Sequence, residues 1–160
     1  MQLDVSLGDP VTPEPQLIEY QQLLAAEGFS ILGYPLATVI AEKLSTAIEL
    51  GDLNTRDRDY GDLYRLLRGN ALDAKEISTA LAITAAYRGI TLRSLSSVIT
   101  DLPQQRQSSY TAWLRRQGSA ASGYPADFAD TVKLVAAFAD PLIRGEAQHG
   151  RWDPDQGRWV

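Results

Sequence analysis

The spacing of apolar residues changes once along the chain, near residue 34. Apolar and polar residues alternate over residues 1–8, which predicts a short strand there. The run 29–34 predicts another strand, and the segment 17–24 fits either a short strand or one or two helical turns. We therefore expect about two or three short strands in the first part of the chain.

Beyond residue 34, apolar residues recur at spacings of three and four, which predicts about five helices packed as an α-helical domain. The fold class expected is therefore α+β, predominantly α. Gly51 and Gly89 are candidate C-caps of the first and third helices. The predicted helix starts are Pro35, then one of Asn54, Thr55 and Asp57, then Asp73, Leu92, Gln104 and Asp127.

The apolar stripes also predict which side chains are buried. In the second helix these are Tyr60, Leu63, Leu66 and Leu67. The third helix, in which Asp73 and Glu76 resemble a capping box, would bury Ile77, Leu81, Ile83, Thr84 and Tyr87. A helix over 92–102 would bury Leu95, Val98, Ile99 and Leu102.

The end of the chain repeats a Gly-Arg-Trp triplet at 150–152 and 157–159. An Asp-Pro turn between the triplets predicts a small hairpin that brings the two tryptophans together. The alternative is a frayed terminus with exposed tryptophans. We favour a docked hairpin, because two large aromatic side chains carry much apolar surface.

Composition narrows the chemistry. The 160 residues include no cysteine and one histidine, His149, so a metal would be held by carboxylates, which favours magnesium. The formal net charge of −5 argues against broad, non-specific coating of nucleic acids. No long apolar run and no signal-peptide pattern is present, so we expect a cytoplasmic protein without a membrane span.

The stretch 41–63 concentrates charge around the first helix connection. Lys43 lies at the edge of an apolar stripe and is followed by alternating Asp and Arg over 56–59, which suits a site for a phosphate-bearing substrate. The structural alternative makes Lys43 an edge charge, with Asp57 and Asp59 favouring a helix N-terminus. The short connection predicts antiparallel helices that place Asp59 or Asp62 near Lys43.

Ala41-Glu42-Lys43 and Asn54-Thr55-Arg56-Asp57-Arg58-Asp59-Tyr60-Gly61-Asp62-Leu63 resemble the AEK and N-x-R-x-K-D-(F/Y)-x-D-L motifs of the AbiEii/AbiGii toxin family. That family includes nucleotidyltransferase toxins of bacterial toxin–antitoxin and phage-defence systems, among them the MenT-type enzymes. Arg58 departs from the common Lys but keeps the charge. The resemblance extends from the first residues to the Trp-containing tail.

The resemblance implies roles for individual residues. The catalytic residues would be Lys43, Asp59 and Asp62, with either aspartate as the conserved-type acid. Lys43, Arg56 and Arg58 would bind the phosphates of an NTP, although the two arginines suit structural ion pairs equally well. Asp4 resembles the third metal-binding carboxylate, for Mg²⁺ in the complete enzyme; the alternative is a solvent-facing residue on an edge strand.

The Gly-Ser motif with paired aspartates, expected upstream of Asp4, is missing from this sequence. The chain is therefore expected to be the C-terminal part of such an enzyme: a truncated product, a fragment or half of a split enzyme. We expect strands of a nucleotidyltransferase core over 1–34, a helical domain over 35–145 and a tail over 146–160. An unpaired strand edge would favour self-association or pairing with the missing half.

Two functions follow from these expectations. The first is the C-terminal part of an AbiEii-like toxin that transfers nucleotides from NTP, in MenT-type relatives to tRNA. The alternative is a non-catalytic helical module that binds a partner protein such as an antitoxin. One grouping of basic and aromatic residues could contact an RNA acceptor: Arg106, Arg115, Arg116, Tyr110 and Trp113. The alternative is that these residues form a solvated helix face.

Overall fold

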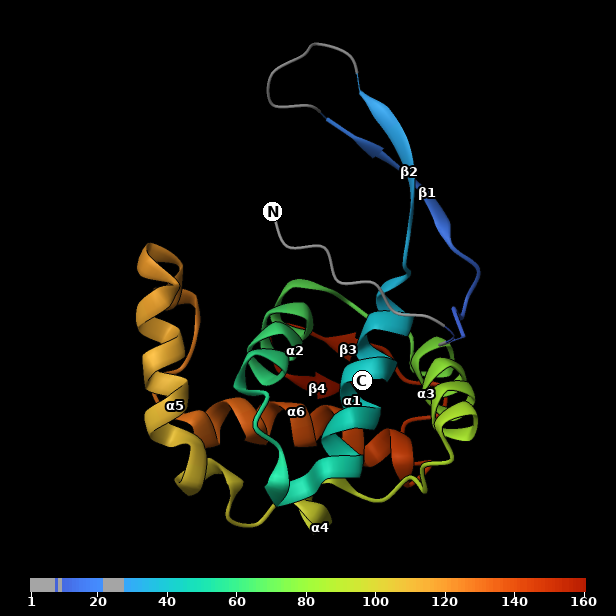
Figure 1. The fold of residues 1–160 in the computed structure, drawn as a ribbon. Coiled ribbons are helices and arrows are strands. Elements are labelled where there is room, and N and C mark those ends of the chain that lie inside the picture. Colours follow the sequence, from blue (N-terminus) through green and yellow to red (C-terminus); the bar gives the residue numbers. More distant parts are fainter. Residues whose placement is uncertain (1–7, 9, 22–27) are drawn as a thin grey trace.

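The computed structural model describes residues 8, 10–21 and 28–160 and has an α+β fold that is predominantly α, as predicted. A β-hairpin near the N-terminus projects from a body of helices, and a very short second hairpin follows the last helix (Figure 1). The elements in chain order are β1 (Gln16–Tyr20), β2 (Phe29–Gly33), α1 (Leu36–Leu50), η1 (Gly51–Leu53), α2 (Asp57–Gly69), α3 (Ala74–Arg88), α4 (Leu95–Val98), α5 (Leu102–Arg116), η2 (Gly118–Gly123), α6 (Phe128–Ile143), β3 (Trp152–Asp153) and β4 (Arg158–Trp159).

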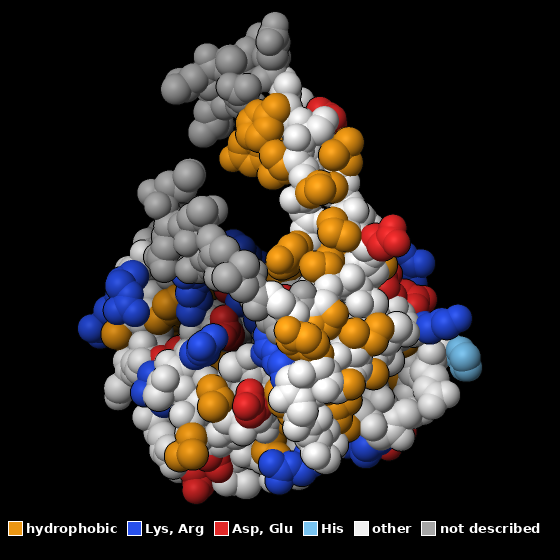
Figure 2. All heavy atoms as spheres, turned by 45° about the vertical axis from the view of Figure 1, so that its right-hand side comes forward, with side chains coloured by type: hydrophobic (Ala, Val, Ile, Leu, Met, Phe, Trp, Pro, Cys, Tyr) orange, Lys and Arg blue, Asp and Glu red, His pale blue; other side chains and the backbone are white. Residues whose placement is uncertain are grey.

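Strands β1 and β2 pair in antiparallel register, with Ile18 opposite Ile31 and Tyr20 opposite Phe29. The strand predicted over 29–34 is thus confirmed, and the ambiguous segment that follows residue 16 is a strand as far as Tyr20. These four side chains share one face of the hairpin, because strand side chains alternate between faces. Each is at least 40% exposed, and apolar side chains cover the projecting hairpin in Figure 2. The strand predicted over 1–8 lies, apart from Gly8, outside the described residues.

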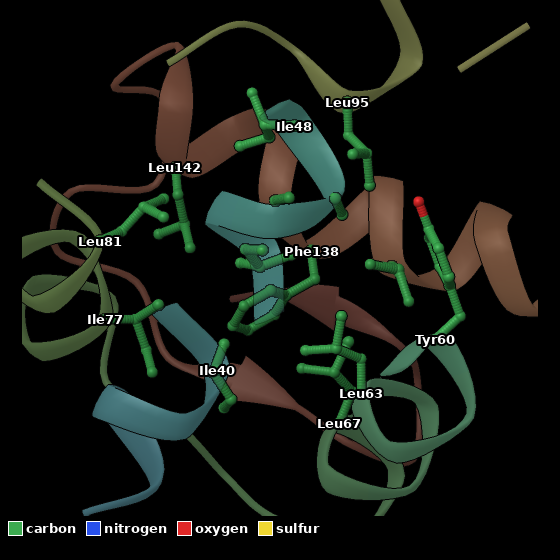
Figure 3. Packing of buried hydrophobic residues seen from close by; sticks show 14 of the residues in the cluster. Ile40, Ile48, Tyr60, Leu63, Leu67, Ile77, Leu81, Leu95, Phe138 and Leu142 are labelled. Carbon is green, nitrogen blue, oxygen red and sulfur yellow. The ribbon is translucent and has the colours of Figure 1, made fainter. Parts of the chain in front are cut away.

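The helical body is built around α1 and α6. Helix α1 packs along α3, whereas α6 contacts α2, α4 and α5 (Figure 1). In Figure 3, Phe138 of α6 lies among apolar side chains from α1, α2 and α3. Ile40, Leu44, Leu63 and Phe138 are fully buried. Amphipathic helices of this kind are stabilised mainly by burying their apolar stripes against one another.

The two predicted caps of α3 are confirmed. The Asp73 carboxylate accepts a hydrogen bond from the Glu76 N–H at 3.0 Å and so caps α3. Gly89 ends α3 in the left-handed conformation, with φ +68°, and its N–H bonds to carbonyls of the last turn. The cap of α2 is none of the three candidates: the helix begins at Asp57, Arg56 occupies the cap position without a side-chain cap bond, and Asn54 instead accepts from the Arg56 N–H.

The predicted buried side of α3 was partly wrong. Ile83 and Tyr87 are 39% and 61% exposed, whereas Ala80 and Ala85 face the core. The buried stripe that runs through Ile77 and Leu81 excludes Ile83 and Tyr87 because they project from other faces of the helix. Small alanines on that stripe let α3 lie close to α1.

The helix predicted over 92–102 is also wrong in extent. Only the four residues of α4 are helical, because Ile99 has an extended backbone and Leu102 already starts α5. Distant carboxylates accept the N–H groups of the first residues of α4 and α5. Asp140 accepts the Leu95 N–H, and Asp52 accepts the Leu102 N–H at 2.8 Å.

The predicted hairpin at the end of the chain is present. Trp152 and Trp159 pair across β3 and β4, with ring centroids 5.4 Å apart. The Trp152 indole N–H donates to the Leu67 carbonyl at 2.8 Å, and that of Trp159 donates to the Phe138 carbonyl at 2.9 Å. The tail is therefore docked on α2 and α6 rather than frayed.

Candidate functional site

A tight connection positions the charged stretch. Gly51 ends α1 with φ +50°, and a Cβ at this position would lie 2.6 Å from the Val98 carbonyl oxygen. Glycine alone fits both the left-handed backbone and this close approach. The chain then passes through η1 and returns as α2 beside α1.

Lys43 of α1 lies between two carboxylates of α2. Its Nζ donates to Asp59 Oδ1 at 2.7 Å and to Asp62 Oδ2 at 3.0 Å. The two aspartates are three residues apart and so share one face of the helix. About a fifth of each of the three side chains is exposed, so the cluster is partly buried but open to solvent. The structure thus brings Lys43, Asp59 and Asp62 together; that they are catalytic stays a prediction.

The aspartates keep Lys43 charged. Burial alone would lower the pKa of the Lys43 ammonium, but the hydrogen bonds and negative charges of Asp59 and Asp62 raise that pKa above its usual value. At neutral pH the group is therefore a fixed cation and not a proton acceptor. An ammonium carries three donors, and the two carboxylates use two of them.

Two arginines flank the cluster. Arg56 Nη1 lies 3.9 Å from Asp59 Oδ2, and Arg58 Nε lies 3.7 Å from Asp62 Oδ2. Both arginine side chains are about two-thirds exposed, so the guanidinium groups remain accessible to a ligand. With Lys43, these ion pairs join three cations to two carboxylates, which leaves one net positive charge.

Asp57 belongs to a different contact. Arg106 of α5 binds it in a bidentate manner, with Nε and Nη2 each 2.9 Å from a carboxylate oxygen, and Ser109 also donates to it. The Asp57 side chain is 8% exposed, so this link joins the start of α2 to α5 inside the fold. Arg106 therefore forms an internal ion pair with Asp57. Its predicted place in an RNA-binding face of α5 is wrong.

The aromatic members of that predicted face are also buried. Tyr110 is fully buried and stacks on Phe128, with ring centroids 4.7 Å apart. Trp113 is 7% exposed and meets Tyr124 edge to face. Neither ring presents a face for stacking on a base. The stacking surface expected on α5 is thus contradicted, although Arg115 and Arg116 are exposed.

The carboxylates of the described part of the chain do not form a metal site. No group of three or more His, Cys, Asp or Glu residues lies close enough together among residues 8, 10–21 and 28–160. Asp59 and Asp62 do converge, but the Lys43 ammonium occupies the space between them. Both carboxylates are therefore paired with the same ammonium. Asp4 lies outside the described residues.

A groove lies beside the Lys43–Asp59–Asp62 cluster, and the sequence patterns did not predict it. It has a volume of about 510 Å³ and is lined by Arg58, Asp62, Arg65, Trp113, Arg116, Gln117 and Tyr124. Lys and Arg side chains gather on the left side of the body in Figure 2. Part of the signal was available, because Arg58, Asp62 and Arg65 follow the i, i+4, i+7 spacing of one helix face. The contribution of α5 depends on tertiary packing.

In the described segments of the chain, each helix is too short or too polar to cross a bilayer.

Comparisons with known proteins give one match. A search of curated proteins and a search of solved structures each find no similar protein. The family model described as nucleotidyl transferase AbiEii toxin, type IV toxin–antitoxin system, matches residues 1–137. That range contains the Lys43–Asp59–Asp62 cluster. The chain therefore belongs to the AbiEii nucleotidyltransferase toxin family, whose assignment to toxin–antitoxin systems implies an antitoxin as partner.

Proposed function

We propose that this chain provides the phosphate-binding part of a nucleotidyltransferase site, in which Lys43 neutralises the triphosphate of an NTP. The observation that carries the proposal is the Lys43 ammonium held by Asp59 and Asp62 at an open, partly buried position. A fixed ammonium can stabilise charge that develops on a phosphate without exchanging its own proton. Membership of the AbiEii family supplies the reaction class.

In this proposal the residues have separate tasks. Lys43 contacts the phosphates, and Asp59 and Asp62 are positioning residues that hold its side chain in place. Arg56 and Arg58 have exposed guanidinium groups next to the same cluster, which suits bidentate contacts to phosphate oxygens. The acceptor of the nucleotidyl group is RNA, with tRNA as the first candidate from the family resemblance.

The chemistry of transfer needs carboxylates beyond this cluster. The Gly-Ser motif with paired aspartates is missing from the sequence, and Asp59 and Asp62 are neutralised by Lys43. Mg²⁺ therefore belongs to acidic residues outside the cluster, with Asp4 as this chain's contribution. We infer that transfer requires a segment that carries the paired aspartates.

The test joins the chain to such a segment, either fused or co-expressed, and measures transfer of labelled nucleotide to RNA. Lys43→Ala should abolish transfer while the circular dichroism spectrum stays unchanged. Lys133→Ala is the matched control, because Lys133 is an exposed lysine on α6. Full transfer by the Lys43→Ala protein would refute the proposed role.

The β1–β2 hairpin favours a second candidate, a non-catalytic module that binds a protein partner such as the antitoxin. Its large apolar side chains are exposed on both faces, with Leu17 and Leu32 about 70% exposed on the face opposite Ile18. Exposed apolar patches of this kind mark interaction sites. Two results together would favour this candidate over the nucleotidyltransferase. The Leu17→Ser/Leu32→Ser variant would lose binding to the antitoxin, and the chain joined to the segment with the paired aspartates would transfer no nucleotide.

A further inference from the structure

The groove between α2 and α5 carries an unusual concentration of positive charge for this chain. Arg58 and Arg65 come from α2, and Arg116 comes from the end of α5. The lining includes a single carboxylate, Asp62, against three guanidinium groups. The whole chain has a net charge of −5, so this local excess runs against the overall balance.

The groove is continuous with the Lys43 cluster through Asp62. One oxygen of that carboxylate lies 3.0 Å from Lys43 Nζ and 3.7 Å from Arg58 Nε. Asp62 therefore stands at the boundary between the two regions and belongs to both. A polyanion that lies in the groove would have one end beside the Lys43 ammonium.

The spacing of the arginines favours a chain of phosphates over a single one. Arg58 and Arg65 are seven residues apart on one helix face, which corresponds to about 10 Å along the axis at a rise of about 1.5 Å per residue. Planar guanidinium groups bind phosphate oxygens in a bidentate manner. Trp113 is buried in the groove wall and packs against Tyr124, so recognition would come from the backbone and not from base stacking.

We propose that this groove binds the phosphodiester backbone of the nucleic-acid acceptor and leads its end to Lys43. The inference rests on the proposed function for its biological meaning, but binding can be measured without any transfer. It fits a single-stranded segment, whose backbone is accessible along one side. It also places the acceptor on α2 and α5, away from the projecting β-hairpin.

The test is fluorescence anisotropy of the full chain with a labelled single-stranded RNA, repeated over a range of salt concentrations. Arg65→Ala/Arg116→Ala should weaken binding about tenfold or more. It should also reduce the slope of log affinity against log salt by about 1.4, because each lost phosphate contact contributes about 0.7 for single strands. Arg93→Ala/Arg158→Ala is the matched control, since it removes the same charge at exposed positions outside the groove.

Each outcome decides the proposal. Equal losses in the two double variants, or no RNA binding at low salt, would overturn it. Polyglutamate serves as a second ligand. If Arg65→Ala/Arg116→Ala loses tight binding of polyglutamate but binds RNA as well as the unmodified chain, the proposal is overturned, because the ligand of the groove would then be an acidic protein segment. A single-stranded DNA of the same sequence tests whether the chain distinguishes the two sugars. Equal affinities for DNA and RNA support recognition through the phosphodiester backbone. Binding of the DNA but not of the RNA would overturn the proposal that the acceptor is RNA.

The two proposals can also fail separately. If the groove variant binds RNA poorly but Lys43→Ala still supports full transfer, the groove stands and the proposed role of Lys43 falls. If transfer depends on Lys43 while the groove variant binds RNA normally, the proposed function stands and the groove inference falls.

Discussion

Lys43 and Asp59 meet across the interface between α1 and α2, with Nζ and Oδ1 2.7 Å apart. They are 16 positions apart in sequence, on either side of the whole α1–α2 connection. The pair, together with the contact of Lys43 to Asp62, links the two helices. It therefore influences stability as well as the proposed chemistry.

Removal of the Lys43 charge should cost modest stability. We expect Lys43→Met to lower the free energy of unfolding by about 1–2 kcal/mol, because two neighbouring, partly buried carboxylates lose their shared cation. Urea unfolding measures the change, and Lys133→Met is the control that should alter it by less than about 0.5 kcal/mol. A loss in Lys43→Met no larger than in the control would show that the cluster does not stabilise the fold.

Stability should fall at alkaline pH. The pKa of Lys43 is raised in the folded state, so its contribution is complete below the pKa of an unfolded lysine, about 10.4, and is lost as pH rises through the folded pKa. Burial likewise raises the pKa of Tyr60 above its usual value of about 10, which acts in the same direction. Lys43→Met should therefore flatten the decline of unfolding free energy above pH 10.

Tyr60 can be followed on its own by its absorbance. In an alkaline titration, Tyr60→Phe should remove one tyrosine that ionises only when the protein unfolds, because Tyr60 is 1% exposed. Loss of a normally titrating tyrosine in the Tyr60 variant would contradict the packing described for α2.

The same substitution should have opposite effects at two positions in α2. A Cβ at Gly61 would lie 2.3 Å from the Trp113 ring, whereas one at Gly69 meets no atom within 4 Å. We expect Gly61→Ala to destabilise the protein by about 1–3 kcal/mol through overpacking. Gly69→Ala should be neutral or stabilise it by up to about 1 kcal/mol. Thermal unfolding of the two variants provides the comparison, and equal melting temperatures would contradict this close contact.

The docked tail should contribute substantially to stability. Trp152 is fully buried, contacts Phe138 and donates to the Leu67 carbonyl. Trp152→Phe should cost about 1–3 kcal/mol, because it leaves that buried carbonyl without its donor and reduces packing. Val160→Ala, at a side chain that is 64% exposed, is the control. Denaturant unfolding that shows no difference between the variants would argue for an undocked tail.

Sequence patterns predicted those features that depend on neighbours along the chain. The buried Tyr60, Leu63 and Leu67 of α2, the cap at Asp73 and the proximity of Lys43 to Asp59 all follow from helix periodicity and a short connection. The extent of α4 could not be predicted, because Asp140 accepts the Leu95 N–H across 45 residues. A local pattern contains no information about such partners.

The misassigned face of α5 has the same origin. Arg106, Tyr110 and Trp113 are a polar and aromatic grouping typical of RNA-binding surfaces, yet the structure buries the two rings and pairs the arginine with Asp57. The three residues recur at spacings of three and four, as a buried stripe also does. Only the position of α2 decides between the two interpretations. The groove that α2 and α5 do form depends on the same tertiary contact.

The hydrogen bond from Trp152 to Leu67 also bears on when the protein can fold during synthesis. It spans 85 residues, and Trp159 then packs on Phe138 from a position near the end of the chain. Helices α1 to α3 emerge from the ribosome long before the residues that complete their core. The complete core can therefore form only after residues 152–159 have been made, since contacts between distant residues form only after both have been made. An activity that depends on the folded body would start only after the ribosome has synthesised the β3–β4 hairpin.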